Sequence, residues 1–238
     1  MARVSKAAEE RQVELLGIAE RMFLERGYDE TPVQAIIDAA GIAKGTFYHH
    51  YPSKSALLDA VLGRMNGRIL GGIIGVVHAP GLDAVTKFGH IFSRTGQFKT
   101  EHRAVFIQMH RALRAEANAA LYSRMVREGA ALMLPLVAQL VEQGVREGVF
   151  DTPYPRQSAR QLLQLSTAMG NLVGDAVLTD GEPTLSIAEL EAEVAAYHDA
   201  VHRLLGAAPG TLQLYDVAQL RLWLESAASI PAPSGGPA

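Results

Sequence analysis

Apolar residues recur every three or four positions along most of this chain, and that spacing is the period of an amphipathic α-helix. No stretch alternates apolar and polar residues in the way that a half-buried strand does. The pattern therefore predicts an all-α protein. Three stripes keep the helical spacing best, and they are made of Leu15, Ala19, Met22 and Phe23, of Leu162, Leu165, Met169, Leu172 and Ala176, and of Ile187, Leu190, Val194, Tyr197, Val201 and Leu204.

Residues 31–54 carry several helix start and stop signals in a short space. Thr31 is a residue type favoured at helix N-caps, and Pro32 fits the first helical position. Gly41 follows the last apolar position and predicts a left-handed helix end. A second short helix is predicted over 44–50, and Ser53 is a good N-cap for a longer helix that follows. We therefore predict two short helices joined by a tight turn, then the start of a third.

The second short helix has one apolar face and one polar face. Phe47 and Tyr51 lie four residues apart and share a face, whereas Lys44, Thr46, Tyr48 and His49 point elsewhere. A cation, hydroxyls and imidazoles suit phosphate oxygens and base edges, so this helix is a candidate reader of a DNA major groove. The spacing alone equally allows an ordinary helical hairpin with a solvated polar face.

The first 60 or so residues resemble the DNA-binding signature of the tetracycline-repressor (TetR) family. A tyrosine at position 51, where phenylalanine is usual, is a small departure. The matching positions are Leu15, Ala19, Phe23, Gly27, Tyr28, Thr31, Val33, Ile36, Ala40, Gly41, Lys44, Gly45, Thr46, Phe47, Tyr48, Tyr51, Lys54, Leu57 and Leu58.

The resemblance implies an N-terminal three-helix helix-turn-helix DNA-binding domain and a C-terminal helical domain for ligand binding and dimerisation. We expect the first domain over 1–54, a linking helix over 53–77, the second domain over 78–206, and a short extra helix with a flexible tail over 207–238. Thr31 and Lys54, at helix N-termini, are expected to contact phosphate. The full set of expected DNA contacts is Thr31, Gln34, Lys44, Gly45, Thr46, Tyr48, His49 and Lys54.

The second domain offers a candidate pocket for a mostly apolar small molecule. A long helix predicted over 118–147 contains Pro135, where we expect a kink. Phe106, Met109 and His110 share one helix face, and a single imidazole among apolar groups could orient a ligand by a hydrogen bond. Ordinary core packing is an equal alternative. The candidate walls are Phe88, Phe106, Met109, His110 and Met133.

The two late apolar stripes are heptad seams, which two copies of the chain could join as a four-helix bundle. TetR-like proteins pair their last two main helices in this way, so the resemblance implies a homodimer on a pseudo-palindromic operator. Packing on the chain's own core is the alternative. The candidate interface residues are Leu165, Met169, Leu172, Val194, Tyr197 and Val201.

Composition narrows the remaining chemistry. The 238 residues carry a net charge of −3 and no cysteine, which excludes disulfides and thiolate metal sites. His198 and His202 have a metal-compatible spacing, but without a third ligand we interpret them as solvated or interface residues. No catalytic set stands out, and we expect no enzyme activity, cofactor or metal. The N-terminus lacks a signal-peptide core, and the longest apolar run, 69–77, is too short for a bilayer, so we expect a cytoplasmic protein.

Charge is uneven along the chain. Between residues 39 and 82, Lys44, Lys54, Arg64 and Arg68 outnumber the single acid Asp59, and we expect this basic stretch to favour DNA.

We therefore expect a transcriptional regulator, most simply a repressor that a small apolar effector releases from DNA. Two alternatives stay open at this point: a DNA-binding dimer without a ligand, and a helical carrier or enzyme for apolar molecules.

Overall fold

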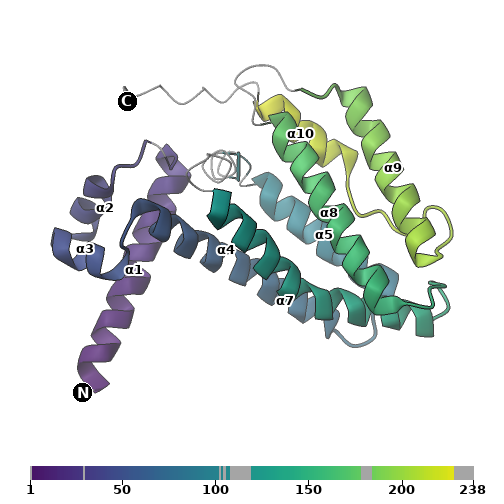
Figure 1. The fold of residues 1–238 in the computed structure, drawn as a ribbon, viewed down its shortest axis with the longest axis horizontal. Helices are drawn as coiled ribbons and strands as arrows, with labels where there is room; N and C mark the ends of the chain where they lie inside the picture. Colours follow the sequence, from purple (N-terminus) through teal and green to yellow (C-terminus); the bar gives the residue numbers. More distant parts are fainter. Residues whose placement is uncertain are drawn as a thin grey trace. The chain divides into compact units, whose positions relative to one another are not determined.

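A computed structural model describes residues 2–28, 30–101, 103, 106–107, 119–177 and 184–227 (Figure 1). Within these residues the regular elements are all α-helices, which confirms the predicted fold class. They are α1 (Ala2–Arg26), α2 (Val33–Ala40), α3 (Lys44–His50), α4 (Lys54–Val77), α5 (Ala84–Glu101), α7 (Ala119–Arg146), α8 (Pro155–Val177), α9 (Ile187–Leu205) and α10 (Val217–Ala227).

The chain divides into two compact units, and the division falls inside α4. The first unit is built around residues 1–68, and it takes in the described residues between 104 and 121. The second unit contains residues 69–103 and the described residues from 122 onward. We describe each unit by itself.

The first unit has a core of apolar side chains from four helices. In it α1 contacts α2, and α2 contacts α3. The buried side chains form the apolar stripes that the sequence predicts. Burying them stabilises the fold by roughly 25 cal/mol per Å² of apolar surface removed from water. The core side chains include Leu15, Ala19 and Phe23 of α1, Ile36 and Ile37 of α2, Phe47 of α3, and Leu57, Leu58 and Val61 of α4.

The second unit is organised around the antiparallel pair α8 and α9, with α10 packed against both of them and against α5 (Figure 1). Phe88 of α5 meets Phe150 edge to face, with ring centroids 6.0 Å apart. The long helix α7 continues without interruption through Pro135, where the sequence predicts a kink. The buried set includes Phe88, Leu140, Val141, Leu162, Leu190, Val201 and Leu205.

Three helix ends of the second unit meet at a buried lysine. Lys87 Nζ donates to the carbonyl oxygen of Val77, at the end of α4, at 2.8 Å and to Gln143 Oε1 of α7 at 3.0 Å. Glu147 Oε2 accepts the backbone N–H of Ala84, at the start of α5, at 2.8 Å. A cation therefore lies at a helix C-terminus and an anion at a helix N-terminus, which is the arrangement that the helix dipoles favour.

By length and composition, α4 alone among the described helices could cross a membrane. This is weak evidence, because core helices of soluble proteins share the property, and Leu57, Leu58 and Val61 of α4 are fully buried.

Candidate DNA-binding surface

The turn between α2 and α3 depends on one glycine. Gly41 lies in the left-handed region, with φ 61° and ψ 33°, and its N–H bonds to the carbonyl of Asp38. The N–H of Ile42 then bonds to the carbonyl of Ile37 at 3.3 Å. These two bonds satisfy carbonyls at the end of α2, as predicted, and they let the chain reverse within three residues before α3 begins.

Helix α3 is anchored on one face and free on the other. Phe47 is fully buried, and its ring meets those of Tyr48 and Tyr51 at 5.2 and 6.2 Å. Tyr48 keeps 44% of its surface exposed, which is unusual for a large aromatic side chain. Of the other expected contact residues of α3, Lys44, Gly45 and His49 are exposed and Thr46 is half-buried. The polar face that the sequence predicts is therefore open to a partner.

Two further expected contact residues lie beside α3 in the chain. Ser53 caps α4, because its Oγ accepts the N–H of Ala56 at 3.0 Å, as predicted. Lys54, the first residue of α4, is half-buried and holds its ammonium 4.3 Å from the ring centre of Tyr28. Gln34 of α2 is exposed and donates to Asp38 Oδ1 at 2.8 Å.

The expectation for Thr31 is wrong. Its side chain is fully buried, and its hydroxyl donates to the carbonyl of Gly27 at 2.6 Å. Pro32 occupies the N-cap position of α2, with φ −66° and ψ 147°, and no side chain caps that helix. The hydroxyl therefore satisfies a carbonyl left free at the end of α1, and it cannot reach a phosphate.

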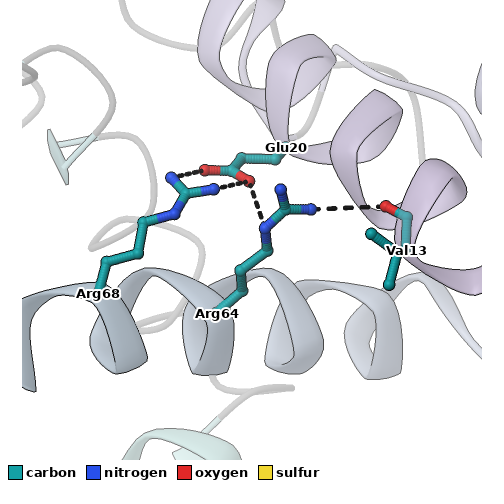
Figure 2. A network of polar contacts seen from close by, with 4 residues as sticks. All are labelled: Val13, Glu20, Arg64 and Arg68. Carbon is teal, nitrogen blue, oxygen red and sulfur yellow. Dashed lines mark hydrogen bonds and ion pairs between the residues drawn. The ribbon is translucent and has the colours of Figure 1, made fainter. Parts of the chain in front are cut away.

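The expected basic stretch is also partly neutralised. Glu20 of α1 is only 9% exposed at its side chain, and it accepts two hydrogen bonds from Arg68 of α4, at 2.8 and 3.0 Å (Figure 2). Arg64 Nε lies 3.4 Å from Glu20 Oε2, and Arg64 Nη1 donates to the carbonyl of Val13 at 3.5 Å (Figure 2). Both arginines are engaged within the first unit, so Lys44 and Lys54 remain as the cations of this stretch that phosphates can attract.

Most of the expected dimer residues face the interior of their own chain. Met169, Val194, Tyr197 and Val201 are buried in the single chain, and α8 and α9 pack against each other. The side chains of these four residues therefore have little surface left for a second copy. Leu165 and Leu172 are half-buried.

The candidate pocket residues are only partly described. Phe88 is buried against Phe150, whereas Phe106 and Met133 are half-buried. Met109 and His110 lie outside the described residues. The pocket itself stays a prediction.

His202 is buried and His198 is half-buried, and the sequence reasoning missed the contacts that both rings make within the chain. Both accept backbone hydrogen bonds from residues 212–215. Their spacing of four residues was the available signal, because it places both rings on one face of a helix. Within the described residues, no three potential metal ligands of the His, Cys, Asp or Glu type gather together.

An all-helical chain with a buried α2–turn–α3 hairpin and an exposed polar face on α3 defines a helix-turn-helix DNA-binding protein. Comparison with known families agrees and is more specific. Residues 15–61 match the family described as bacterial regulatory proteins, tetR family. This part of the chain is therefore a tetR-type DNA-binding region.

Its relatives support this assignment mainly over the N-terminal region. The HTH-type transcriptional repressor KstR2 of Rhodococcus jostii is 50% identical over 52 residues, which cover 22% of this chain and 26% of that protein. KstR2 of Mycobacterium tuberculosis is 45% identical over 62 residues, which cover 26% of this chain and 31% of that protein. An uncharacterised HTH-type transcriptional regulator of Mycobacterium bovis is 30% identical over 139 residues, which cover 56% of this chain and 64% of that protein. The match thus spans about a quarter to a third of the KstR2 relatives.

Solved structures extend the likeness of fold to most of the chain. A TetR-family regulator from Pectobacterium atrosepticum superposes with a TM-score of 0.63 at 18% identity, covering 84% of this chain and 96% of that one. The SmeT–triclosan complex gives a TM-score of 0.58 at 18% identity, covering 87% and 98%. At these identities the likeness shows the fold alone.

Proposed function

We propose that this protein is a cytoplasmic, sequence-specific DNA-binding regulator that represses transcription as a homodimer and leaves its operator when a small, mostly apolar effector binds. The observation that carries the proposal is the exposed polar face of α3, opposite a fully buried Phe47. A helix held rigidly on one face can present the other to base edges with little loss of side-chain entropy on binding. The KstR2 relatives are named as repressors, which supports repression.

On this proposal Lys44, Tyr48 and His49 contact the groove and backbone, Thr46 contributes to base preference, and Lys54 contacts phosphate at the start of α4. Two lysines in each copy give about four phosphate contacts in the dimer. Since each contact contributes about −0.9 to the slope of log K against log salt concentration, a slope of about −4 follows. That value is modest, and it suits a regulator that must leave DNA readily.

A second copy would meet the outward faces of α8 and α9, because the inward seams are already filled. Leu165 and Leu172 are the expected interface residues that keep part of their surface accessible. A two-fold dimer of this kind places two α3 helices on successive half-sites of a pseudo-palindrome.

The effector part of the proposal rests on the second unit. The SmeT structure of the same fold was determined with triclosan, which supports a pocket for an apolar molecule. Phe88 and Met133 belong to that unit in this chain, and they are the described candidates for its walls. Binding can release DNA only if the effector has a higher affinity for the DNA-free state than for the bound state.

Selection of binding sites from random DNA, followed by affinity measurement at several salt concentrations, tests the DNA-binding proposal. Lys44→Ala should weaken binding to all sequences and reduce the salt slope by about 2 per dimer, because one phosphate contact is lost in each copy. Arg127→Ala, at an exposed cation of α7, is the matched control and should leave the affinity and the salt slope unchanged. If Lys44→Ala binds as tightly as the parent protein, with the same slope, α3 is not the reading helix. A selected site without two-fold symmetry would contradict the dimer.

A further inference from the structure

Two histidines of α9 accept backbone hydrogen bonds from the chain that follows it. His202 Nε2 accepts the N–H of Leu212 at 3.1 Å. His198 Nε2 accepts the N–H of Leu214 at 3.0 Å and lies 3.3 Å from the N of Tyr215, which also donates to it. One face of α9 thus supplies, through two imidazoles, the acceptors for three backbone donors of an extended segment.

We name residues 211–227 the C-terminal strap. It consists of the extended segment 211–216 and helix α10, and α10 packs against α5, α8 and α9. Leu212, Leu214 and Leu224 anchor it with at most 4% exposure. Trp223 Nε1 donates to Thr100 Oγ1 of α5 at 3.2 Å. The strap is therefore held by apolar anchors and by the histidine acceptors together.

The acceptor role fixes the protonation state of both rings. An imidazole nitrogen accepts a hydrogen bond only through its lone pair, so each histidine must be neutral with its proton on Nδ1. A protonated ring carries a hydrogen on both nitrogens, and its Nε2–H would then point at a backbone N–H. We propose that the strap is a pH-sensitive element, which acid releases from α9 by protonating His198 and His202.

The described charged groups around the two rings are either engaged with other residues or exposed to water. Burial, and secondly the neighbouring His202, hold the pKa of His198 below its ordinary value. Burial raises the pKa of Tyr197, and it raises that of Tyr215 to about 12, so both phenols facing the pair stay neutral in acid. Among the described residues, no carboxylate forms an ion pair with either histidine. Some charged groups on the surrounding elements are engaged: Asp199 pairs with Arg203, Glu191 pairs with Arg221, and Asp216 caps α10. The others are exposed, and they are Arg156, Arg160 and Asp175 of α8, His90, Arg94 and Lys99 of α5, and Asp151 beside the end of α9.

The sign of the pH dependence follows from these contacts. The docked strap requires neutral rings, whereas a free histidine has a pKa of about 6.5. Docking is therefore at full strength above pH 6.5 and weakens as the pH falls below it, because protons bind preferentially to the released state. One pH unit below that value, protonation of the released His198 weakens docking about tenfold.

Hydrogen exchange of the full chain tests the proposal directly. After correction for intrinsic exchange rates, the protection factors of the Leu212, Leu214 and Tyr215 amides should fall about tenfold between pH 7.5 and 5.5. Trp223 is the single tryptophan of the chain, and its emission should shift to the red over the same range as the strap leaves α5.

A double variant, His198→Gln with His202→Gln, supplies the matched comparison. The amide oxygen of glutamine can accept the same N–H groups but does not titrate in this range, so the acid-induced loss should disappear. His90→Gln, at an exposed position of α5 in the same unit, is the control and should titrate like the parent protein.

Two results would overturn the proposal: unchanged protection of the three amides at pH 5.5, or the same acid loss in the double glutamine variant. If that variant does not fold, nitrogen NMR of the unaltered protein decides instead. A neutral Nδ1–H tautomer of both rings, lost together with amide protection, supports the pH-sensitive strap. An Nε2–H tautomer at neutral pH excludes it.

Discussion

Replacing Glu20 with glutamine should loosen α1 from α4 while keeping the shape of the side chain. In the protein, the Glu20 carboxylate accepts a bidentate pair of hydrogen bonds from Arg68 and lies 3.4 Å from Arg64 Nε. The amide of glutamine carries no charge and offers only one acceptor oxygen. The two guanidinium groups would then lose their counter-charge and at least one hydrogen bond.

The expected cost follows from how much of each partner reaches water. Breaking a fully buried ion pair costs about 3–5 kcal/mol, because the remaining charge stays buried and unpaired. Here the side chain of Glu20 is 9% exposed, but those of Arg64 and Arg68 are 34% and 50% exposed. The arginines can recover hydration after the change, and exposed pairs contribute only about 0–1 kcal/mol. We therefore expect a loss of about 1–3 kcal/mol in the free energy of unfolding.

Urea unfolding, followed by circular dichroism, measures this loss. Glu14→Gln changes an exposed glutamate of the same helix and should alter stability by less than about 0.5 kcal/mol. A double-mutant cycle with Arg68→Gln should show coupling, since the second change costs less once the carboxylate is gone. If Glu20→Gln is no more destabilising than Glu14→Gln, the ion pair of Figure 2 does not hold the two helices together.

Gly206→Ala should be clearly more destabilising than Gly41→Ala when both are measured by thermal unfolding. Both positions have φ near +60°, which costs alanine about 1–2 kcal/mol. A Cβ at Gly206 would also lie 2.2 Å from the Asp151 carbonyl oxygen, whereas a Cβ at Gly41 would have no heavy atom of another part of the described chain within 4 Å. Equal losses would show that the backbone at Gly206 shifts freely. Among the described residues the buried Tyr51 hydroxyl has no hydrogen-bond partner, although the Gln12 side chain approaches it, so Tyr51→Phe should raise the free energy of unfolding by about 1 kcal/mol. Destabilisation by this change would show that the hydroxyl is bonded in solution.

The parts of the fold that could be predicted are those set by neighbours in the chain. The Gly41 turn, the buried face of Phe47 and the Ser53 cap involve residues within five positions of their partners, so start and stop signals and helical spacing indicate them directly. The same holds for the exposed face of α3, since burying one face of a short helix leaves the opposite face free.

The parts that could not be predicted depend on partners far away in the chain. Arg68 is 48 residues from Glu20, so counting charges along the sequence could not show that this cation is engaged. Thr31 has a residue type that caps helices, but its hydroxyl found a nearer acceptor at the end of the preceding helix. Periodicity in α8 and α9 showed that each has an apolar face, and it could not show that the two faces cover each other.

The C-terminal strap bears on the dimer as well, because both proposals concern the same pair of helices. Tyr215 of the strap donates to the carbonyl of Ser166 of α8 at 3.2 Å, and the Ser166 hydroxyl lies 2.8 Å from the hydroxyl of Tyr197 of α9. The strap therefore joins α8 to α9 on one side, while Leu165 and Leu172 of α8 keep surface for a second copy. If release of the strap weakens the dimer by some factor, dimerisation must strengthen docking of the strap by the same factor, since coupling free energies are reciprocal. Strap protection at pH 5.5 should then rise with protein concentration, whereas protection that is independent of concentration would mean that the strap and the interface respond separately.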